Sequence, residues 1–252
     1  MSIILDPWFY AAAVPAVIIL GLAKGGFTGV GIAATPLLAL YLPPLEAAAL
    51  LLPVLISQDL ISLYVYRRHW DGENLKIMLP GALVGMALAW WTASIVSDDA
   101  VRIIVGSVGL IFVLNMALRP DLHVTKHSRP AGLFWGAVSG FTSFMTQGGG
   151  PPFQVYVLPQ RLPKLVFVGT TTIFFAIINA LKIGPYLALG NFTTADIGTS
   201  IALLPLAAVA NLGGIWLVKH MPTELFYRLA YILLFVVSVA LLIQGGSHLL
   251  WK

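Results

Sequence analysis

The sequence predicts an all-α, polytopic membrane protein. Of its 252 residues, 59% are hydrophobic and only 10% are charged, whereas a soluble domain carries about 25% charged residues. The apolar residues form runs of about 20 or more, the length at which a helix crosses a bilayer. These runs fill the chain and leave no room for a soluble domain. We therefore expect a single membrane domain over residues 1–252.

The apolar runs are arranged as two similar halves. About eight hydrophobic segments are expected, at residues 8–42, 45–66, 77–96, 100–118, 131–158, 165–189, 197–218 and 225–244. A polar linker, residues 119–130, separates repeat one (about 8–118) from repeat two (about 131–245). Short matches recur in the same order, such as Leu79-Pro80 and Leu204-Pro205. The sequence thus predicts an internal duplication with two homologous halves.

The first segment of each half is broken by glycine and proline. The stretches are residues 21–31 in the first half and 136–152 in the second. Both residue types weaken a helix, and irregular backbone at membrane depth survives only inside protein or beside a water-filled cavity. Interrupted segments at matching places of two halves are typical of a transporter's binding site.

Each broken segment can cross once or return as a re-entrant hairpin, and the two alternatives orient the halves differently. Single crossings give parallel halves and leave Arg161, Lys164 and Lys219 outside, against the positive-inside rule. Hairpins give inverted halves, place those three residues in the cytoplasm and leave Lys252 outside. We favour the re-entrant hairpins and inverted repeats, because inverted repeats are common in secondary transporters.

Lys24 is the most informative residue of the first half. It lies deep in its apolar run, where a charge costs about 3 kcal/mol. Its neighbouring glycines expose N–H groups that can bind an anion beside the ammonium group; alternatively, Lys24 marks a hairpin tip at the membrane interface. Asp59 either pairs with Lys24 or couples transport to protons, and Gln58 is the second coupling candidate.

The second half offers neutral polar groups. At least one of the three consecutive threonines, Thr170, Thr171 and Thr172, is expected to face a cavity, although such hydroxyls often bond to their own backbone. Asn179 shares a helix face with Thr172. Lys182 is nearer the segment end and is expected at the interface. Asn211 is expected to pack helices together.

Enzyme chemistry has no support in the sequence. There is no cysteine, the five histidines form no metal-binding pattern, and a P-loop is missing. The net charge of +4 comes mainly from loops, where it sets orientation and does not indicate nucleic-acid binding. We expect no catalytic residue, no cofactor and no metal.

The two glycine clusters together resemble the sulfite exporter TauE/SafE family, also called the toluene sulfonate uptake permease family. The first motif stands as Gly21-x-x-x-Gly25-Gly26-Phe27-x-Gly29-Val30-Gly31 with Pro36 after it, the second as Gly140-Phe141-x-x-Phe144-x-x-Gln147-Gly148-Gly149-Gly150-Pro151, and the threonine element as Val168-Gly169-Thr170-Thr171. The similarity spans about residues 12–245. Lys24 and Gln147 depart from the family pattern. The resemblance implies transport of a small anion such as sulfite, sulfoacetate or another organosulfonate.

We predict a secondary transporter, with export as the favoured direction, that holds an organosulfur anion between the two broken segments and works by alternating access. The expected partners are the anion and the lipid bilayer of the inner (plasma) membrane; a homodimer is compatible with the sequence. The rival functions are a small-anion channel and a membrane assembly subunit whose glycines only pack helices. The predicted substrate-binding residues are Lys24, Gly25, Gly26, Thr28, Gly29, Thr142, Gln147, Gly148, Gly149, Gly150, Thr170, Thr171 and Asn179.

Overall fold

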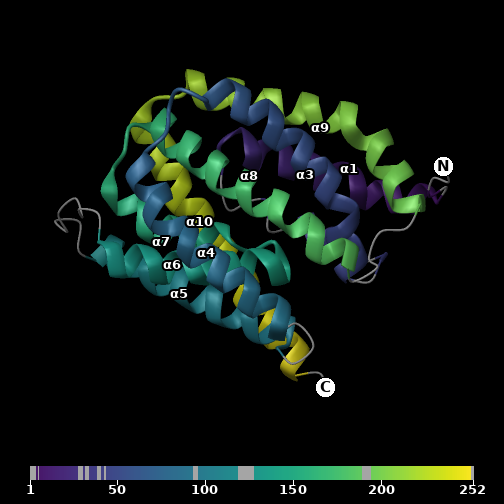
Figure 1. Cartoon of the computed structure of the whole chain (residues 1–252), viewed down its shortest axis with the longest axis horizontal. Helices are drawn as coiled ribbons and strands as arrows, with labels where there is room; N and C mark the ends of the chain where they lie inside the picture. Colours follow the sequence, from purple (N-terminus) through teal and green to yellow (C-terminus); the bar gives the residue numbers. More distant parts are fainter. Residues whose placement is uncertain are drawn as a thin grey trace.

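A computed structural model describes residues 4, 6–27, 31, 34–38, 41–42, 44–92, 96–118, 128–188 and 194–250. The regular elements in these ranges are helices, as predicted (Figure 1). They are α1 (Pro7–Gly25), α2 (Ala34–Leu38), α3 (Pro44–Tyr66), α4 (Gly72–Thr92), α5 (Asp98–Leu118), α6 (Arg129–Thr146), α7 (Gly150–Val157), the 3₁₀ turn η2 (Leu158–Gln160), α8 (Lys164–Ala188), α9 (Thr194–His220) and α10 (Thr223–Leu250).

Five described helices are long and apolar enough to cross a membrane: α1, α4, α8, and the parts Ile197–His220 of α9 and Thr223–Ser247 of α10. The predicted segment 77–96 began too late, because the first turn of α4 is polar and apolarity alone does not mark it. The predicted linker ended too late, since α6 begins at Arg129. Pro130 fits its first turn, where no backbone N–H bond is lost.

Both predicted breaks in the helices are confirmed. Helix α1 ends at Gly25, and Gly26 follows with a φ of 140°, which glycine adopts without a steric penalty. The N–H of Gly26 bonds back to the carbonyl of Ala23 and closes the helix end. Helix α6 ends at Thr146, where Gln147 takes a left-handed φ of 57° before α7 begins.

Helix α1 packs closely and in parallel along α9. A Cβ on Gly21 would lie 2.4 Å from the Cβ of Ala210, and one on Gly25 would lie 2.5 Å from the backbone of Gly214. Small residues four apart on each helix allow this approach, as in membrane helix pairs in general. The residue numbers rise together along the contact, so both helices run in the same direction.

Helices α4 and α6 pack in the equivalent way. A Cβ on Gly81 would lie 2.1 Å from the carbonyl oxygen of Leu133, and one on Gly85 would lie 1.9 Å from that of Ala137. This contact is also parallel. Each half therefore contributes its first long helix to a close contact with a helix of the other half.

Helix α3 lies between α9 and α8. It runs parallel to α9, since Leu50 meets Ser200 and Gln58 meets Ala207. Because α1 is also parallel to α9, the connection that contains α2 returns the chain to the end at which α1 began. Helix α3 runs antiparallel to α8: Asp59 bonds Asn179, while Tyr66 lies against Gly169.

The last helices of the two halves, α5 and α10, also run antiparallel. Gly109 lies against Ser238, whereas Gly245, further along α10, lies against the carbonyl oxygen of Asp99 at the start of α5. Helix α1 begins and α10 ends on the right-hand side of Figure 1.

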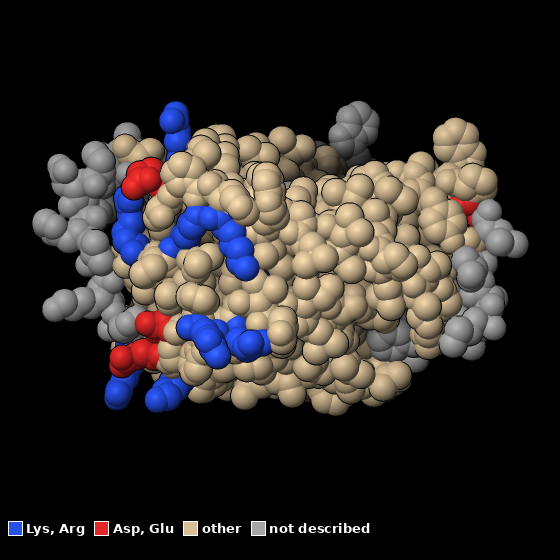
Figure 2. Space-filling model, turned by 90° about the horizontal axis from the view of Figure 1, so that it is seen from above, with Lys and Arg blue, Asp and Glu red and all other residues tan. Residues whose placement is uncertain are grey.

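Lysine and arginine gather at one end of the molecule (Figure 2). Contacts between turns build this end: Lys164 donates to the carbonyl of Val218, Tyr227 donates to the carbonyl of Leu162, and Gly169 lies against the carbonyl oxygen of His69. The basic residues in and around these turns are Arg67, Arg68, Lys76, Arg129, Arg161, Lys164, Lys219 and Arg228. We name this surface the basic end.

The close contact between α4 and α6 gives a stability prediction. Gly85→Ala forces a Cβ into the backbone of Ala137, so we expect a loss of about 1–3 kcal/mol in the free energy of unfolding. Gly213→Ala is the matched control, because a Cβ there meets nothing within 4 Å; it should be neutral or stabilising by up to about 1 kcal/mol. Thermal unfolding of the purified protein measures both, and equal stability of the two variants would contradict the packing.

Candidate functional site

An ion pair joins the end of α1 to the middle of α3. The Nζ atom of Lys24 lies 2.5 Å from Oδ1 of Asp59, and their side chains are only 14% and 4% exposed. Lys24 also lies 5.8 Å from the ring centre of Phe175 on α8. The predicted pairing of Asp59 with Lys24 is thus confirmed, while proton coupling by Asp59 stays a prediction.

Asn179 on α8 extends this pair toward α6. Its Nδ2 donates to Oδ2 of Asp59 at 2.7 Å, and its Oδ1 accepts from Nζ of Lys182 at 3.2 Å. The acceptor at one end and the donor at the other fix the orientation of the amide. Both carboxylate oxygens of Asp59 are therefore engaged.

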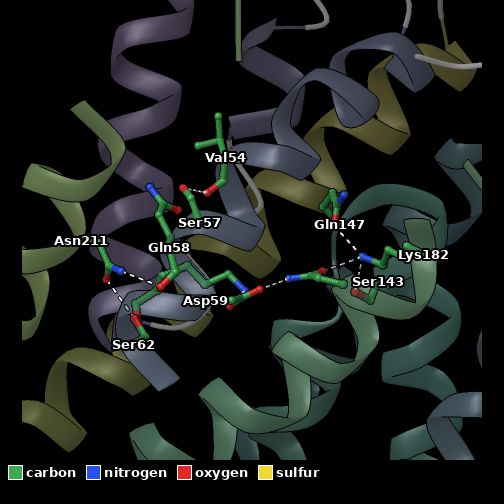
Figure 3. Close-up of polar contacts among 11 residues, drawn as sticks. Val54, Ser57, Gln58, Asp59, Ser62, Ser143, Gln147, Lys182 and Asn211 are labelled. Atoms are coloured by element: carbon green, nitrogen blue, oxygen red, sulfur yellow. Dashed lines mark hydrogen bonds and ion pairs between the residues drawn. The ribbon is translucent and has the colours of Figure 1, made fainter. Parts of the chain in front are cut away.

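Lys182 is completely buried, which corrects the expected position at the interface. Its Nζ donates to Oγ of Ser143 at 2.8 Å and to Oε1 of Gln147 at 2.7 Å. Helix α8 continues for six residues beyond Lys182, and the side chain lies on the face of α8 that carries Asn179, so it points inward. Figure 3 shows Lys182 beside Ser143 and Gln147, with Asp59 across from them.

These contacts link a set of residues that we name the polar chain: Lys24, Asp59, Asn179, Lys182, Ser143 and Gln147. The polar chain borders a cavity of about 80 Å³. Because one water needs about 10–15 Å³ measured in this way, several waters or one small oxyanion fit. The cavity lies between the ends of the two broken segments, α1 and α6, and against α8. Its lining consists of Leu20, Ala23, Lys24, Gly26, Gly31, Leu55, Ser143, Gln147, Gly150, Pro151, Val168, Thr171, Thr172, Phe175 and Asn179.

Six of the predicted binding residues line this cavity, namely Lys24, Gly26, Gln147, Gly150, Thr171 and Asn179. The expectation that at least one of the three threonines faces a cavity is confirmed by Thr171 and Thr172. Thr171 donates its hydroxyl proton to the carbonyl of Phe167, so only the lone pairs of its oxygen are left to face the cavity.

Other predicted residues have structural contacts away from the described lining. Thr170 accepts from the N–H of Asp71 at the basic end, and Thr142 donates to the carbonyl of Val138 in its own helix. Gly25 packs against α9 and accepts through its carbonyl from the hydroxyl of Tyr66.

The remaining glycines belong to the turn after α6. Gly148 donates its N–H to the carbonyl of Thr142, and Gly149 accepts through its carbonyl from Ser139. Thr28 and Gly29 lie outside the described residues. For all of the predicted binding residues, anion binding stays a prediction.

Gln58 points to the other side of α3. Its Nε2 donates to the backbone carbonyl of Ala207, and the backbone carbonyl of Gln58 accepts from Nδ2 of Asn211 on α9. Asn211 also lies 3.1 Å from the hydroxyl of Ser62, so the expected packing role of Asn211 is confirmed. Figure 3 places Gln58, Ser62 and Asn211 on one side of Asp59 and the Lys182 group on the other.

The side-chain amide nitrogen of Gln147, Nε2, is an unused donor. Since Oε1 accepts from Lys182, Nε2 is the atom left over, and in the described part of the chain this buried nitrogen has no hydrogen-bond partner. A buried amide without a partner costs about 1–3 kcal/mol. Gln147 lines the cavity, so an acceptor there would satisfy it.

Two residues of the polar chain were among neither the predicted binding residues nor the coupling candidates: Lys182 and Ser143. A signal for Lys182 existed in the spacing of α8. Thr171, Phe175, Asn179 and Lys182 follow one another at intervals of four, four and three residues, which is one helix face. Ser143 has no such signal, because its role depends on the contact between α6 and α8.

A comparison with known protein families shows which family the chain belongs to. The model of the family described as "Sulfite exporter TauE/SafE" matches residues 13–241. The chain belongs to this family. As a TauE/SafE member with five long apolar helices among its described residues, it is a multi-pass membrane protein of a transporter family. Searches of curated proteins and of solved structures gave no match.

The ion pair of this TauE/SafE protein gives a second prediction. Asp59→Leu leaves the largely buried charge of Lys24 uncompensated, and removal of one partner of a buried pair costs about 3–5 kcal/mol. The double variant Lys24→Met/Asp59→Leu removes both charges and should recover most of that loss. Thermal unfolding of the purified variants measures the effect; a double variant no more stable than Asp59→Leu would contradict it.

Proposed function

We propose that the protein is a secondary transporter that exports a small oxyanion, such as sulfite, sulfoacetate or another organosulfonate. The anion is bound in the cavity between the ends of α1 and α6. The observation that carries this proposal is the unpartnered Nε2 of Gln147 in a cavity lined also by Lys24. An oxyanion supplies the acceptor that Gln147 lacks and the negative charge that Lys24 attracts.

Asp59 does not oppose an anion in this proposal. One of its oxygens contacts Lys24 and the other accepts from Asn179, so its charge is compensated before the anion enters. Lys24 retains donors, because an ammonium group has three N–H bonds. The anion therefore meets the remaining N–H donors of Lys24 and not an uncompensated carboxylate.

The apolar part of the lining strengthens these polar contacts. Leu20, Leu55, Val168 and Phe175 exclude water around the donors, and hydrogen bonds to charged groups are stronger in a low dielectric. The anion must give up its hydration, so the donors of Lys24 and Gln147 offset that cost. The small cavity favours anions of few atoms.

The same proposal includes inverted repeats and alternating access. The antiparallel course of α3 against α8 and of α5 against α10 supports inversion, because these are corresponding helices of the two halves. The return of the chain between α1 and α3 supports a re-entrant hairpin. The basic end is cytoplasmic by the positive-inside rule, in the inner membrane.

The rival channel function differs in its flux. The flux through a carrier with this cavity saturates at modest anion concentration and responds to a proton gradient. The flux through a channel does neither. Flux into liposomes separates the two functions. An assembly subunit would show no specific stabilisation by any anion.

Gln147→Leu tests the proposed site. It removes the free donor at similar volume, together with the oxygen that accepts from Lys182. Loss of one hydrogen bond to a charged group should weaken anion binding about 10-fold or more. Gln244→Leu on α10 is the matched control and should bind as the unmodified protein does. Thermal shift with sulfite, thiosulfate, methanesulfonate and small carboxylates measures binding. Equal affinity of both variants would place the anion elsewhere.

A reporter fused to the C-terminus tests the topology. Inverted halves leave Lys252 on the side opposite the basic end, so we expect a reporter that is active only outside the cytoplasm to function there. A cytoplasmic reporter serves as the control on the same fusion site. A cytoplasmic signal from the C-terminus is incompatible with inverted halves and would return the parallel arrangement.

A further inference from the structure

Lys182 has an unusual environment for a lysine. Its side chain is completely buried, and in the described part of the chain it forms no ion pair. Its three partners are neutral oxygens on Ser143, Gln147 and Asn179. A buried charge without a counter-charge is costly, even when it is hydrogen-bonded.

The three partners suit both protonation states of the Lys182 nitrogen. The ammonium form donates to all three oxygens. The neutral amine donates to the amide oxygens of Gln147 and Asn179, which only accept, and it accepts from the hydroxyl of Ser143, which can turn to donate. Lys182 can therefore gain or lose a proton while all three contacts are kept.

Every partner of Lys182 also lines the cavity. An anion there lies one side chain away from the Lys182 nitrogen, so its charge stabilises the ammonium form. The charged groups around Lys182 are Lys24 on α1, which opposes protonation, and Asp59 on α3, which favours it but is already compensated by Lys24. Helix α6 and the turn after it present only the neutral Ser143 and Gln147.

We propose that Lys182 is the proton-coupling residue of this transporter: it takes up a proton when the anion enters the cavity and releases it when the anion leaves. The inference rests on the proposed function. An O–H bond of a hydronium ion breaks, its proton joins the lone pair of Nζ, and a neutral water molecule is left. A monovalent anion and its proton then cross together without net charge, in the direction set by their combined gradients.

Proton uptake on binding tests the inference. Methanesulfonate is the probe, because it does not itself titrate near neutral pH. Calorimetric titration of the purified full-length protein, in buffers of different ionisation enthalpy, should show uptake of about one proton per anion at mildly alkaline pH. Lys182→Arg, which stays charged, should bind the anion with no proton uptake. Lys219→Arg makes the same change at an exposed lysine and should match the unmodified protein.

Three results would overturn the inference. The first is methanesulfonate binding to the unmodified protein without proton uptake. The second is unchanged proton uptake by Lys182→Arg, which would return the coupling role to Asp59. The third applies if Lys182→Arg does not fold: anion flux by the unmodified protein in liposomes that carries net charge, where electroneutral flux is expected. If no anion stabilises or binds the folded protein at all, the proposed function itself fails, a result distinct from binding without protons.

Discussion

The membrane interior cannot hold an uncompensated charge, and this constraint governs the centre of the molecule. Lys24 lies where α1 breaks, and only Asp59 on α3 is close enough in the described chain to form an ion pair with it. That pair sets the register of α1 against α3, and Asn179 then fixes α8 to the same carboxylate. Three helices from both halves are thus held around one charge, and the cavity lies beside them.

Much of the fold could be predicted from hydrophobicity and helix-breaking residues. The runs of apolar residues gave the helices, and the glycines gave the breaks at Gly26 and after Thr146. Helix boundaries at polar turns were less accurate, as at Gly72, because apolarity does not extend to them. The pairing of α1 with α9 and of α4 with α6 had no sequence signal beyond small residues, since pairing depends on three-dimensional packing.

The candidate site was predictable where the chemistry was extreme. A charge inside an apolar run, as at Lys24 and Asp59, requires compensation wherever it lies, so the pair could be inferred. Lys182 is buried and not at the interface, because the distance of a residue from a segment end does not show which helix face it lies on. The individual glycines were hardest to interpret: Gly25 packs against Gly214, whereas its neighbour Gly26 lines the cavity.

The exchange of helices between the halves limits how the molecule can move. Backbone contacts such as Gly25 against Gly214 and Gly85 against Ala137 tie each half to the other at van der Waals distance. A swing of one half as a rigid body would have to open both contacts at once, and lipid cannot replace them. The short helices after the breaks, α2 and α7, belong to neither pair. Mechanically, the pairs α1–α9 and α4–α6 form one frame that joins the two halves.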